Sequence, residues 1–197
     1  MAATKHTIVA LVEDKPGVLN RMASLFRRRG FNIESIAVGR SEIPHLSRMT
    51  IVVDGATTMV EQVRKQLDKV IDVVKVSDIS GDDVIARELA LIKVKATSST
   101  RSEIMQIVDI FRAKIVDVAS DSVTVEVTGD EEKVDSLYGL LRGFGIREIV
   151  RTGRVAMVRG SSGPLVVEER LSDTRNKRQK NSLIKNKGEG NHGKDIL

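Results

Sequence analysis

The residues best suited to chemistry form one short run, Asp14-Lys15-Pro16-Gly17-Val18-Leu19. It follows an apolar, strand-like stretch and opens a stretch with helical spacing. Asp14 is predicted to accept hydrogen bonds from the first amides of that helix, and Pro16 suits its first turn. Gly17 lets a ligand approach the backbone, and free amides at a helix start suit a carboxylate or phosphate. A plain strand-to-helix turn without a ligand is the alternative, and these residues alone do not decide between the two.

Patterns typical of catalysis or metal binding are lacking in the sequence. His6, His45 and His192 have no metal-ligand spacing, and there is no cysteine. Neither a G-x-S-x-G nucleophile motif nor a phosphate-binding Gly-Lys-Ser/Thr motif is present. The sequence therefore predicts no metal site and favours a binding protein over an enzyme.

Composition indicates a globular protein with an aliphatic core. Hydrophobic residues make up 41% of the 197 residues, whereas aromatic residues make up 3% and tryptophan is absent, so Val, Ile and Leu must fill the core. No apolar run reaches the ~18 residues of a membrane span, and the N-terminus does not resemble a signal peptide. The absence of cysteine also fits the cytoplasm, where we expect the protein to be located.

The net charge of +5 comes from the C-terminal tail. Residues 174–197 contain seven Lys/Arg and two Asp/Glu, so the rest of the chain is neutral. A solvated tail is favoured over a binding arm. The strand pattern described next also occurs in an RNA-binding fold, but that fold stacks bases on aromatic residues of its central strands. Residues 8–12 and 48–53 carry none, so we expect no nucleic-acid partner.

Hydrophobic periodicity predicts two βαββαβ units, which is an α+β fold built from two ferredoxin-like domains. The first unit has strands at 6–13, 31–39, 48–53 and 73–79, with helices at 18–29 and 58–71. The second has strands at 89–96, 114–119, 122–127 and 146–151, with helices at 102–113 and 130–144. Similar segments in the two units, such as Leu25-Phe26-Arg27 and Ile110-Phe111-Arg112, indicate an internal duplication.

These units set the predicted domain boundaries: domains at 5–79 and 88–159, a linker at 80–87, and a disordered basic tail at 160–197. Whether part of 164–171 forms a short strand or helix is left open. The second unit has Ala96-Thr97-Ser98-Ser99-Thr100 where the first has its Pro-Gly turn, so we expect any ligand site to have been lost there.

Asp14-Lys15-Pro16-Gly17-Val18-Leu19 resembles the loop of ACT domains, which are βαββαβ modules that bind amino acids and regulate enzymes. Three further stretches and parts of the second unit resemble the small, regulatory subunit of acetolactate synthase (acetohydroxyacid synthase). They are residues 29–35, 46–51 and 66–73, then Arg87-Glu88-Leu89 and Ile115-Val116-Asp117-Val118. The resemblance covers about residues 5–159 and leaves out the tail.

The resemblance implies a non-catalytic subunit that activates a catalytic large subunit, a transferase, and confers feedback inhibition by valine or related branched-chain amino acids. The effector would lie between the ACT domains of a homodimer, paired through edge strands. Gly17, Val18 and Leu19 would bind its carboxylate, with Lys15 and Pro16 in the same loop. Asp14 and Asn32 are candidates for its ammonium group, and Leu19 and Ile33 for its side chain; the family usually has Asn at the position of Asp14.

The resemblance also implies that this chain holds no cofactor, and that thiamine diphosphate, Mg²⁺ and FAD belong to the catalytic subunit. A free-standing amino-acid sensor that regulates another enzyme is the alternative function.

Overall fold

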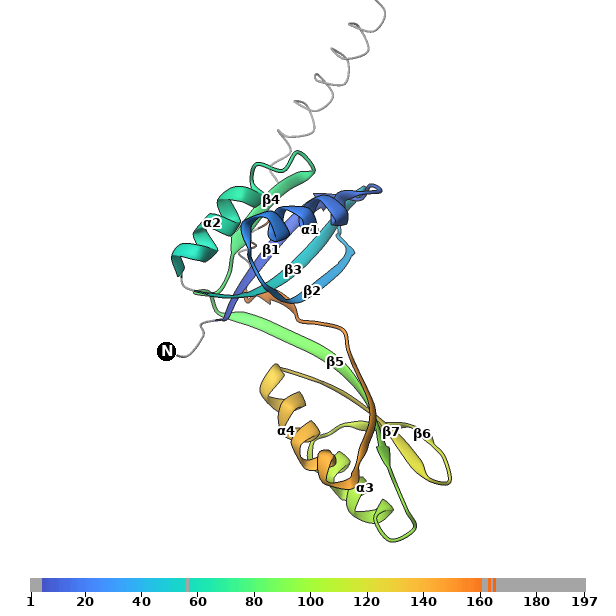
Figure 1. Ribbon diagram of the computed structural model, residues 1–197. Coiled ribbons are helices and arrows are strands. Elements are labelled where there is room, and N and C mark those ends of the chain that lie inside the picture. Colours follow the sequence, from blue (N-terminus) through green and yellow to red (C-terminus); the bar gives the residue numbers. More distant parts are fainter. Residues whose placement is uncertain (1–4, 56, 161–162, 164, 166–197) are drawn as a thin grey trace, which may run out of the picture. The chain divides into compact units, whose positions relative to one another are not determined.

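In the computed structural model, the described residues are 5–55, 57–160, 163 and 165. The N-terminal half forms the predicted βαββαβ unit, with an antiparallel sheet in the order β2-β3-β1-β4 (Figure 1). Its elements are β1 (Lys5–Glu13), α1 (Val18–Arg29), β2 (Ile33–Arg40), β3 (Leu46–Asp54), α2 (Thr57–Leu67) and β4 (Val73–Asp78).

A single face of this sheet carries the helices. Helix α1 has the predicted bounds and buries four apolar side chains at helical spacing, Val18, Met22, Leu25 and Phe26. It ends at Gly30, whose φ of 68° is left-handed, a conformation that glycine adopts without a steric penalty. These side chains pack with alternate residues of β1 and β3, and the result is the aliphatic core that the composition predicts.

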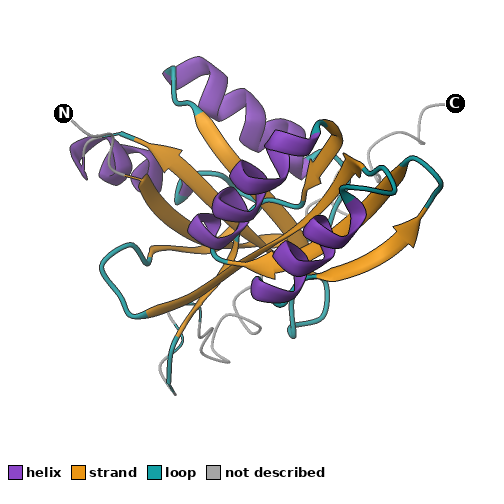
Figure 2. Ribbon diagram, turned by 90° about the horizontal axis from the view of Figure 1, so that it is seen from below, coloured by secondary structure: helices purple, strands orange, loops and turns teal. Residues whose placement is uncertain are grey.

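The C-terminal half repeats the pattern, with its sheet in the order β6-β7-β5-β8. Figure 2 colours the helices and strands of the whole molecule by type. The elements are β5 (Val84–Lys95), α3 (Arg101–Ile110), β6 (Lys114–Val118), β7 (Ser122–Gly129), α4 (Glu131–Leu141), one turn of 3-10 helix (Arg142–Phe144), β8 (Ile146–Arg151) and β9 (Val155–Val158). The two predicted ferredoxin-like units are therefore confirmed.

Strand β5 is longer than predicted because it belongs to two pairings. Residues 88–95 pair with β7 and 90–94 with β8, whereas residues 84–87 pair with β9 in a separate two-stranded ribbon. Residues 84–87, which the sequence assigns to a linker, are thus strand, and β9 was not predicted at all. Both sheets belong to one compact unit of the chain, which ends at Leu165.

Of the predicted tail, residues 161–162, 164 and 166–197 lie outside the described residues, including most of the segment 164–171. Within the described part of the chain, no helix is long and apolar enough to span a membrane.

Candidate functional site

The turn between β1 and α1 is anchored at its start and open at its end. The Asp14 amide donates to the His45 carbonyl over 2.9 Å, and the Lys15 ammonium lies 2.6 Å from the Glu13 carboxylate. Helix α1 then begins after Gly17, which has a φ of 87° and no side-chain cap. The prediction that Asp14 caps the helix is wrong, because the turn holds Asp14 beside His45 and the helix starts three residues later than a cap at Asp14 requires.

The end of this turn leaves backbone donors available to a ligand. Among the described residues, the amides of Gly17, Leu19 and Asn20 have no protein acceptor, as expected at the start of a helix. A Cβ atom built on Gly17 would meet nothing within 4 Å, so the approach is open. Val18 is buried, whereas Leu19 is 52% exposed. The turn therefore offers free amides, the positive end of a helix dipole and one exposed aliphatic side chain.

A basic hollow of about 490 Å³ continues from Gly17 along the outer face of α1. It is lined by Gly17, Asn20, Arg21, Ser24, Arg27 and Arg28. Arg21 forms an ion pair with Asp72, which turns part of its charge away from a ligand. Sequence reasoning missed Asn20, Arg21 and Ser24, although the steps of three and four residues from Gly17 indicate a polar helix face.

Asn32 and Ile33 do not lie beside this turn in the same chain. Glu13 pairs with Leu46 at one end of β3, whereas Ile33 pairs with Val53 near the other end. Val53 is seven steps along β3 from Leu46, which corresponds to about 23 Å at ~3.3 Å per residue. The eight predicted site residues therefore fall into two groups, 14–19 and 32–33, at opposite ends of one sheet.

Strand β2, at the edge of the N-terminal sheet, is exposed and apolar. Ile36 is 41% and Val38 45% exposed, and both lie on the helix-bearing face next to β3. An edge strand with unpaired backbone groups and apolar side chains is suited to pairing with another strand.

The corresponding turn in the C-terminal half is closed by its own side chains. The Thr97 amide donates to Thr100 Oγ1 over 2.9 Å, and the Thr100 amide donates to Thr97 Oγ1 over 3.3 Å. The Thr100 amide, which precedes α3 as the Gly17 amide precedes α1, is thus bonded within the turn, and the loss of a ligand site here stays a prediction.

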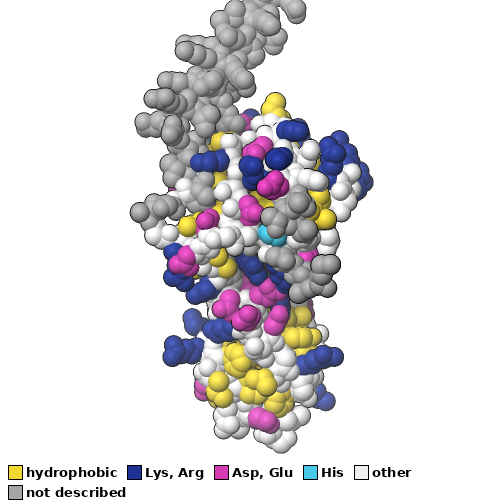
Figure 3. All heavy atoms as spheres, turned by 90° about the vertical axis from the view of Figure 1, so that its left-hand side faces the viewer, with side chains coloured by type: hydrophobic (Ala, Val, Ile, Leu, Met, Phe, Trp, Pro, Cys, Tyr) yellow, Lys and Arg dark blue, Asp and Glu magenta, His cyan; other side chains and the backbone are white. Residues whose placement is uncertain are grey.

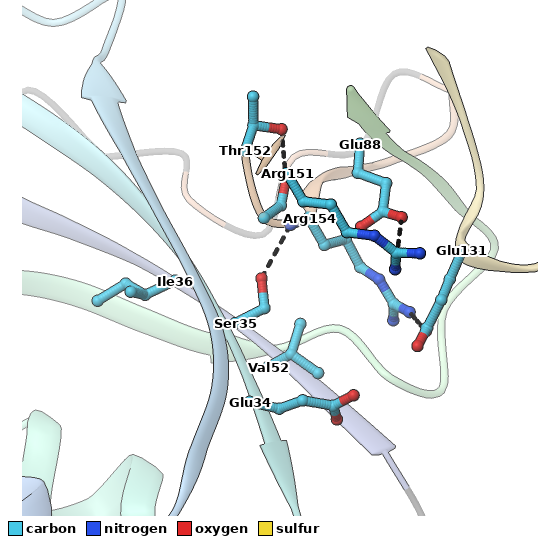
Figure 4. Close-up of a pocket in the computed structure, with 10 residues that line it drawn as sticks. Glu34, Ser35, Ile36, Val52, Glu88, Glu131, Arg151, Thr152 and Arg154 are labelled. Carbon is cyan, nitrogen blue, oxygen red and sulfur yellow. Dashed lines mark hydrogen bonds and ion pairs between the residues drawn. The ribbon is translucent and has the colours of Figure 1, made fainter. Parts of the chain in front are cut away.

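A second hollow, of about 320 Å³, brings charged residues of both halves together (Figure 4). The Arg154 amide donates to Ser35 Oγ over 2.9 Å, and the Arg154 guanidinium donates to Glu131 over 2.5 Å. Lys5 forms ion pairs with Glu131 and, over 2.5 Å, with Glu34. The cations and carboxylates of this hollow already pair with one another. We therefore interpret the hollow as a structural contact and not as a ligand site. Within the described residues, no group of His, Asp and Glu could hold a metal ion.

We expect the ion pairs of Lys5 to stabilise the protein less as the pH becomes alkaline. The hydrogen bond to Glu131, followed by that to Glu34, holds the pKa of Lys5 above its ordinary value. The folded pKa thus exceeds the unfolded one, so the stabilisation is complete below the unfolded pKa and disappears as the pH rises through the folded pKa. Lys5→Met should lower the melting temperature by about 2–4 °C near neutral pH, for pairs worth ~1 kcal/mol together, and by less above about pH 11.

Thermal unfolding of wild type and variant across this pH range checks the Lys5 prediction. Lys65→Met, which removes an exposed pair within α2, is the matched control and should change the melting temperature less. An equal loss for Lys5→Met at all pH values would show that its packing matters and its charge does not.

Two family models match the chain. One, an AHAS small subunit-like ACT domain, covers residues 8–75, and the other, the small subunit of acetolactate synthase, covers residues 87–160. A probable acetolactate synthase small subunit of Archaeoglobus fulgidus is 59% identical over 157 residues, which are 80% of this chain and 98% of that protein. The acetolactate synthase small subunit of Mycobacterium leprae is 54% identical over 158 residues, 80% of this chain and 94% of that protein.

A solved structure agrees with these sequences. The crystal structure of the acetolactate synthase small subunit from Thermotoga maritima matches with a TM-score of 0.75 and 44% identity, over 81% of this chain and 99% of that one. The resemblance noted in the sequence is thus confirmed over both halves, and the chain belongs to the family of acetolactate synthase small subunits.

Proposed function

We propose that this protein is the regulatory subunit of an acetolactate synthase: it binds the catalytic subunit, raises its activity and makes it sensitive to feedback by branched-chain amino acids. The open turn at Gly17, in a chain whose two halves both match the small-subunit family, is the observation that carries this proposal. The chain itself needs no cofactor for this role, and thiamine diphosphate, Mg²⁺ and FAD would belong to the catalytic subunit.

The effector would bind between two copies of the N-terminal domain. If β2 pairs antiparallel with its own copy about a two-fold axis, the Arg40 end of one strand meets the Ile33 end of the other. The Gly17 turn lies at the Arg40 end of its sheet, since Glu13 pairs with Leu46 and Arg40 with Ser47. The turn of one copy and Asn32 and Ile33 of the second copy would then share one site, which explains why they lie apart in a single chain.

In such a site the free amides of Gly17 and Leu19 would bind the effector carboxylate, beside Lys15 and Pro16. The ammonium group would face Asp14 or the Asn32 amide oxygen of the second copy. Leu19 and Ile33 would contact the aliphatic side chain. A methylene group in such a pocket changes affinity by only ~1–3 kcal/mol, so valine, leucine and isoleucine are all suitable effectors.

We expect the purified protein to raise the rate of acetolactate formation by its cognate catalytic subunit, and added valine, leucine or isoleucine to lower that rate again. Both rates are measured with the catalytic subunit alone and with the reconstituted complex. An unchanged rate on addition of this chain would count against the proposal, as would recovery of a different enzyme bound to the native protein.

The dimer makes a separate prediction. Val38→Lys places a charge on the apolar edge strand that would face the second copy, so we expect the mass in solution to fall to that of one chain and the feedback response to be lost. Ile110→Lys is the control for the mass measurement alone, because Ile110 is 76% exposed on α3, in the half that does not carry β2. Light scattering after size-exclusion chromatography measures the mass, and a Val38→Lys variant with the mass of wild type would refute pairing through β2.

The C-terminal half is suited to contact the catalytic subunit. Met105 and Ile110 on α3 and Leu140 on α4 are exposed, and hydrophobic side chains gather on this half in the lower part of Figure 3. Exposed apolar side chains that gather in this way are typical of protein-binding surfaces.

A further inference from the structure

A third hollow, of about 380 Å³, lies on the sheet face that α1 and α2 leave free. It is bounded by β2 and β3 on one side and by the ribbon of β5 and β9 on the other, and it shares no residue with the Gly17 turn or with Asn32 and Ile33. Its volume is within the range of small-molecule sites.

Strand register explains how the two walls are built. Ala37 pairs with Thr50 and Gly39 with Arg48, so these four residues share the face opposite the helical core. On the ribbon, Ile85 pairs with Met157 and Arg87 with Val155, which again places four residues on one face. Two small residues, Ala37 and Gly39, leave room on the first wall, and three aliphatic side chains, Ile85, Val155 and Met157, line the second.

The charge of this hollow is positive and uncompensated. Arg40, Arg48 and Arg87 line it, and none of its lining residues is acidic. Among the described residues, none of these arginines has a carboxylate at ion-pair distance. Arg48 is half-buried, and its guanidinium donates one hydrogen bond to the Ala156 carbonyl over 2.9 Å. Burial lowers the pKa of Arg48 and the more distant Glu42 partly opposes that, as expected for a guanidinium without a close anion.

We propose that this hollow binds a small organic acid, namely a carboxylate on a short aliphatic chain without an ammonium group. The free guanidinium donors would bind the carboxylate in the bidentate manner typical of arginine. The ribbon side chains Ile85, Val155 and Met157 would cover the aliphatic chain. An amino-acid zwitterion fits less well, because no carboxylate lines the hollow to accept its ammonium group. The site is therefore distinct in place and in ligand chemistry from the proposed effector site.

The test uses the full chain and two compounds with one carbon skeleton, 4-methylpentanoate and leucine, with 4-methylpentanamide as the uncharged analogue. Isothermal titration calorimetry should show saturable binding of 4-methylpentanoate, undiminished by saturating leucine, and at least tenfold weaker binding of the amide. Arg48→Gln keeps a donor for Ala156 and should weaken carboxylate binding at least tenfold. Arg87→Gln, at an exposed position, should also weaken binding, which covers the case in which Arg48→Gln fails to fold.

Two controls separate this site from general charge and from the effector site. Arg142→Gln removes an exposed arginine of the other half and should bind 4-methylpentanoate as wild type does. Gly17→Asp should also retain this binding. The proposal would be overturned by any of three results: no saturable binding of 4-methylpentanoate in the millimolar range, equal binding of the acid and the amide, or unchanged binding in both arginine variants. A second copy of the chain that fills the hollow and covers Arg48 and Met157 would also overturn the proposal.

Discussion

Replacing Gly17 by aspartate is expected to abolish feedback inhibition while the protein still activates its catalytic subunit. The new carboxylate would lie beside the free amides of the turn, where the effector carboxylate is proposed to bind. Like-charge repulsion at ~4 Å is worth about 1–4 kcal/mol, which corresponds to at least a roughly fivefold rise in the inhibitory concentration of valine. The fold should tolerate the change, because nothing lies within 4 Å of the added Cβ and aspartate accepts left-handed φ better than most residues.

Acetolactate formation by the reconstituted complex, titrated with valine, measures the effect of Gly17→Asp. Gly17→Asn has the same shape as Gly17→Asp without the charge, so it should weaken inhibition less. The difference between the two variants separates charge repulsion of the effector from the loss of space for it. Gly17→Ala reports the backbone strain alone. Inhibition of the aspartate variant at wild-type valine concentrations would show that the turn is only structural.

Replacing Gly153 by alanine should destabilise the protein by about 2–4 kcal/mol, which lowers the melting temperature by roughly 5–12 °C. Gly153 lies between β8 and β9 with a φ of 82°. An added Cβ would come within 2.8 Å of Ser35 Oγ and 3.1 Å of the Ile36 carbonyl oxygen. The Ser35 hydroxyl is held by the Arg154 amide and the Ile36 oxygen is backbone, so the turn must move away from β2.

Gly145→Ala is the matched control for Gly153→Ala. Gly145 has a φ of 97°, but its Cβ would meet only Lys95 Cβ, at an ordinary 3.8 Å. This variant therefore reports the backbone strain without the clash, and scanning calorimetry of both proteins gives the difference. If the two variants have the same melting temperature, the contact between the Gly153 turn and β2 contributes nothing to stability.

Local sequence patterns predicted the elements whose partners are close in the chain. Helix α1 has its predicted bounds because Gly17 and Gly30 mark its ends and its apolar residues follow one helical face. The pairing of residues 84–87 with β9 was missed, since these partners are about 70 residues apart and strand formation depends on that partner more than on local propensity. Helix α2 ends at Leu67, four residues before the predicted end, because Val70 and Val73 pack into the core from a turn and a strand.

The free amides of the candidate site were predicted from the sequence, but its geometry was not. The type of loop at 14–19 indicates free amides, and the structure has them. Asn32 lies at the other end of the sheet because α1 runs back from the Gly17 turn and β2, like β1, is antiparallel to β3, so β2 begins at the end where β1 begins. Likewise, Asp14 does not cap α1: its amide is bonded to His45, a loop residue whose φ of 64° no local pattern indicates.

The shared strand β5 sets an order of events during synthesis. The N-terminal sheet can be complete once β4 ends at Asp78, but residues 84–87 leave the ribosome before their partner strand, Val155–Val158, exists. At ~5–20 residues per second, the ribosome needs about 4–14 s to make the intervening chain. For that interval the nascent protein carries an unpaired strand edge next to a finished domain, and the ribbon can close only after the second domain has been made.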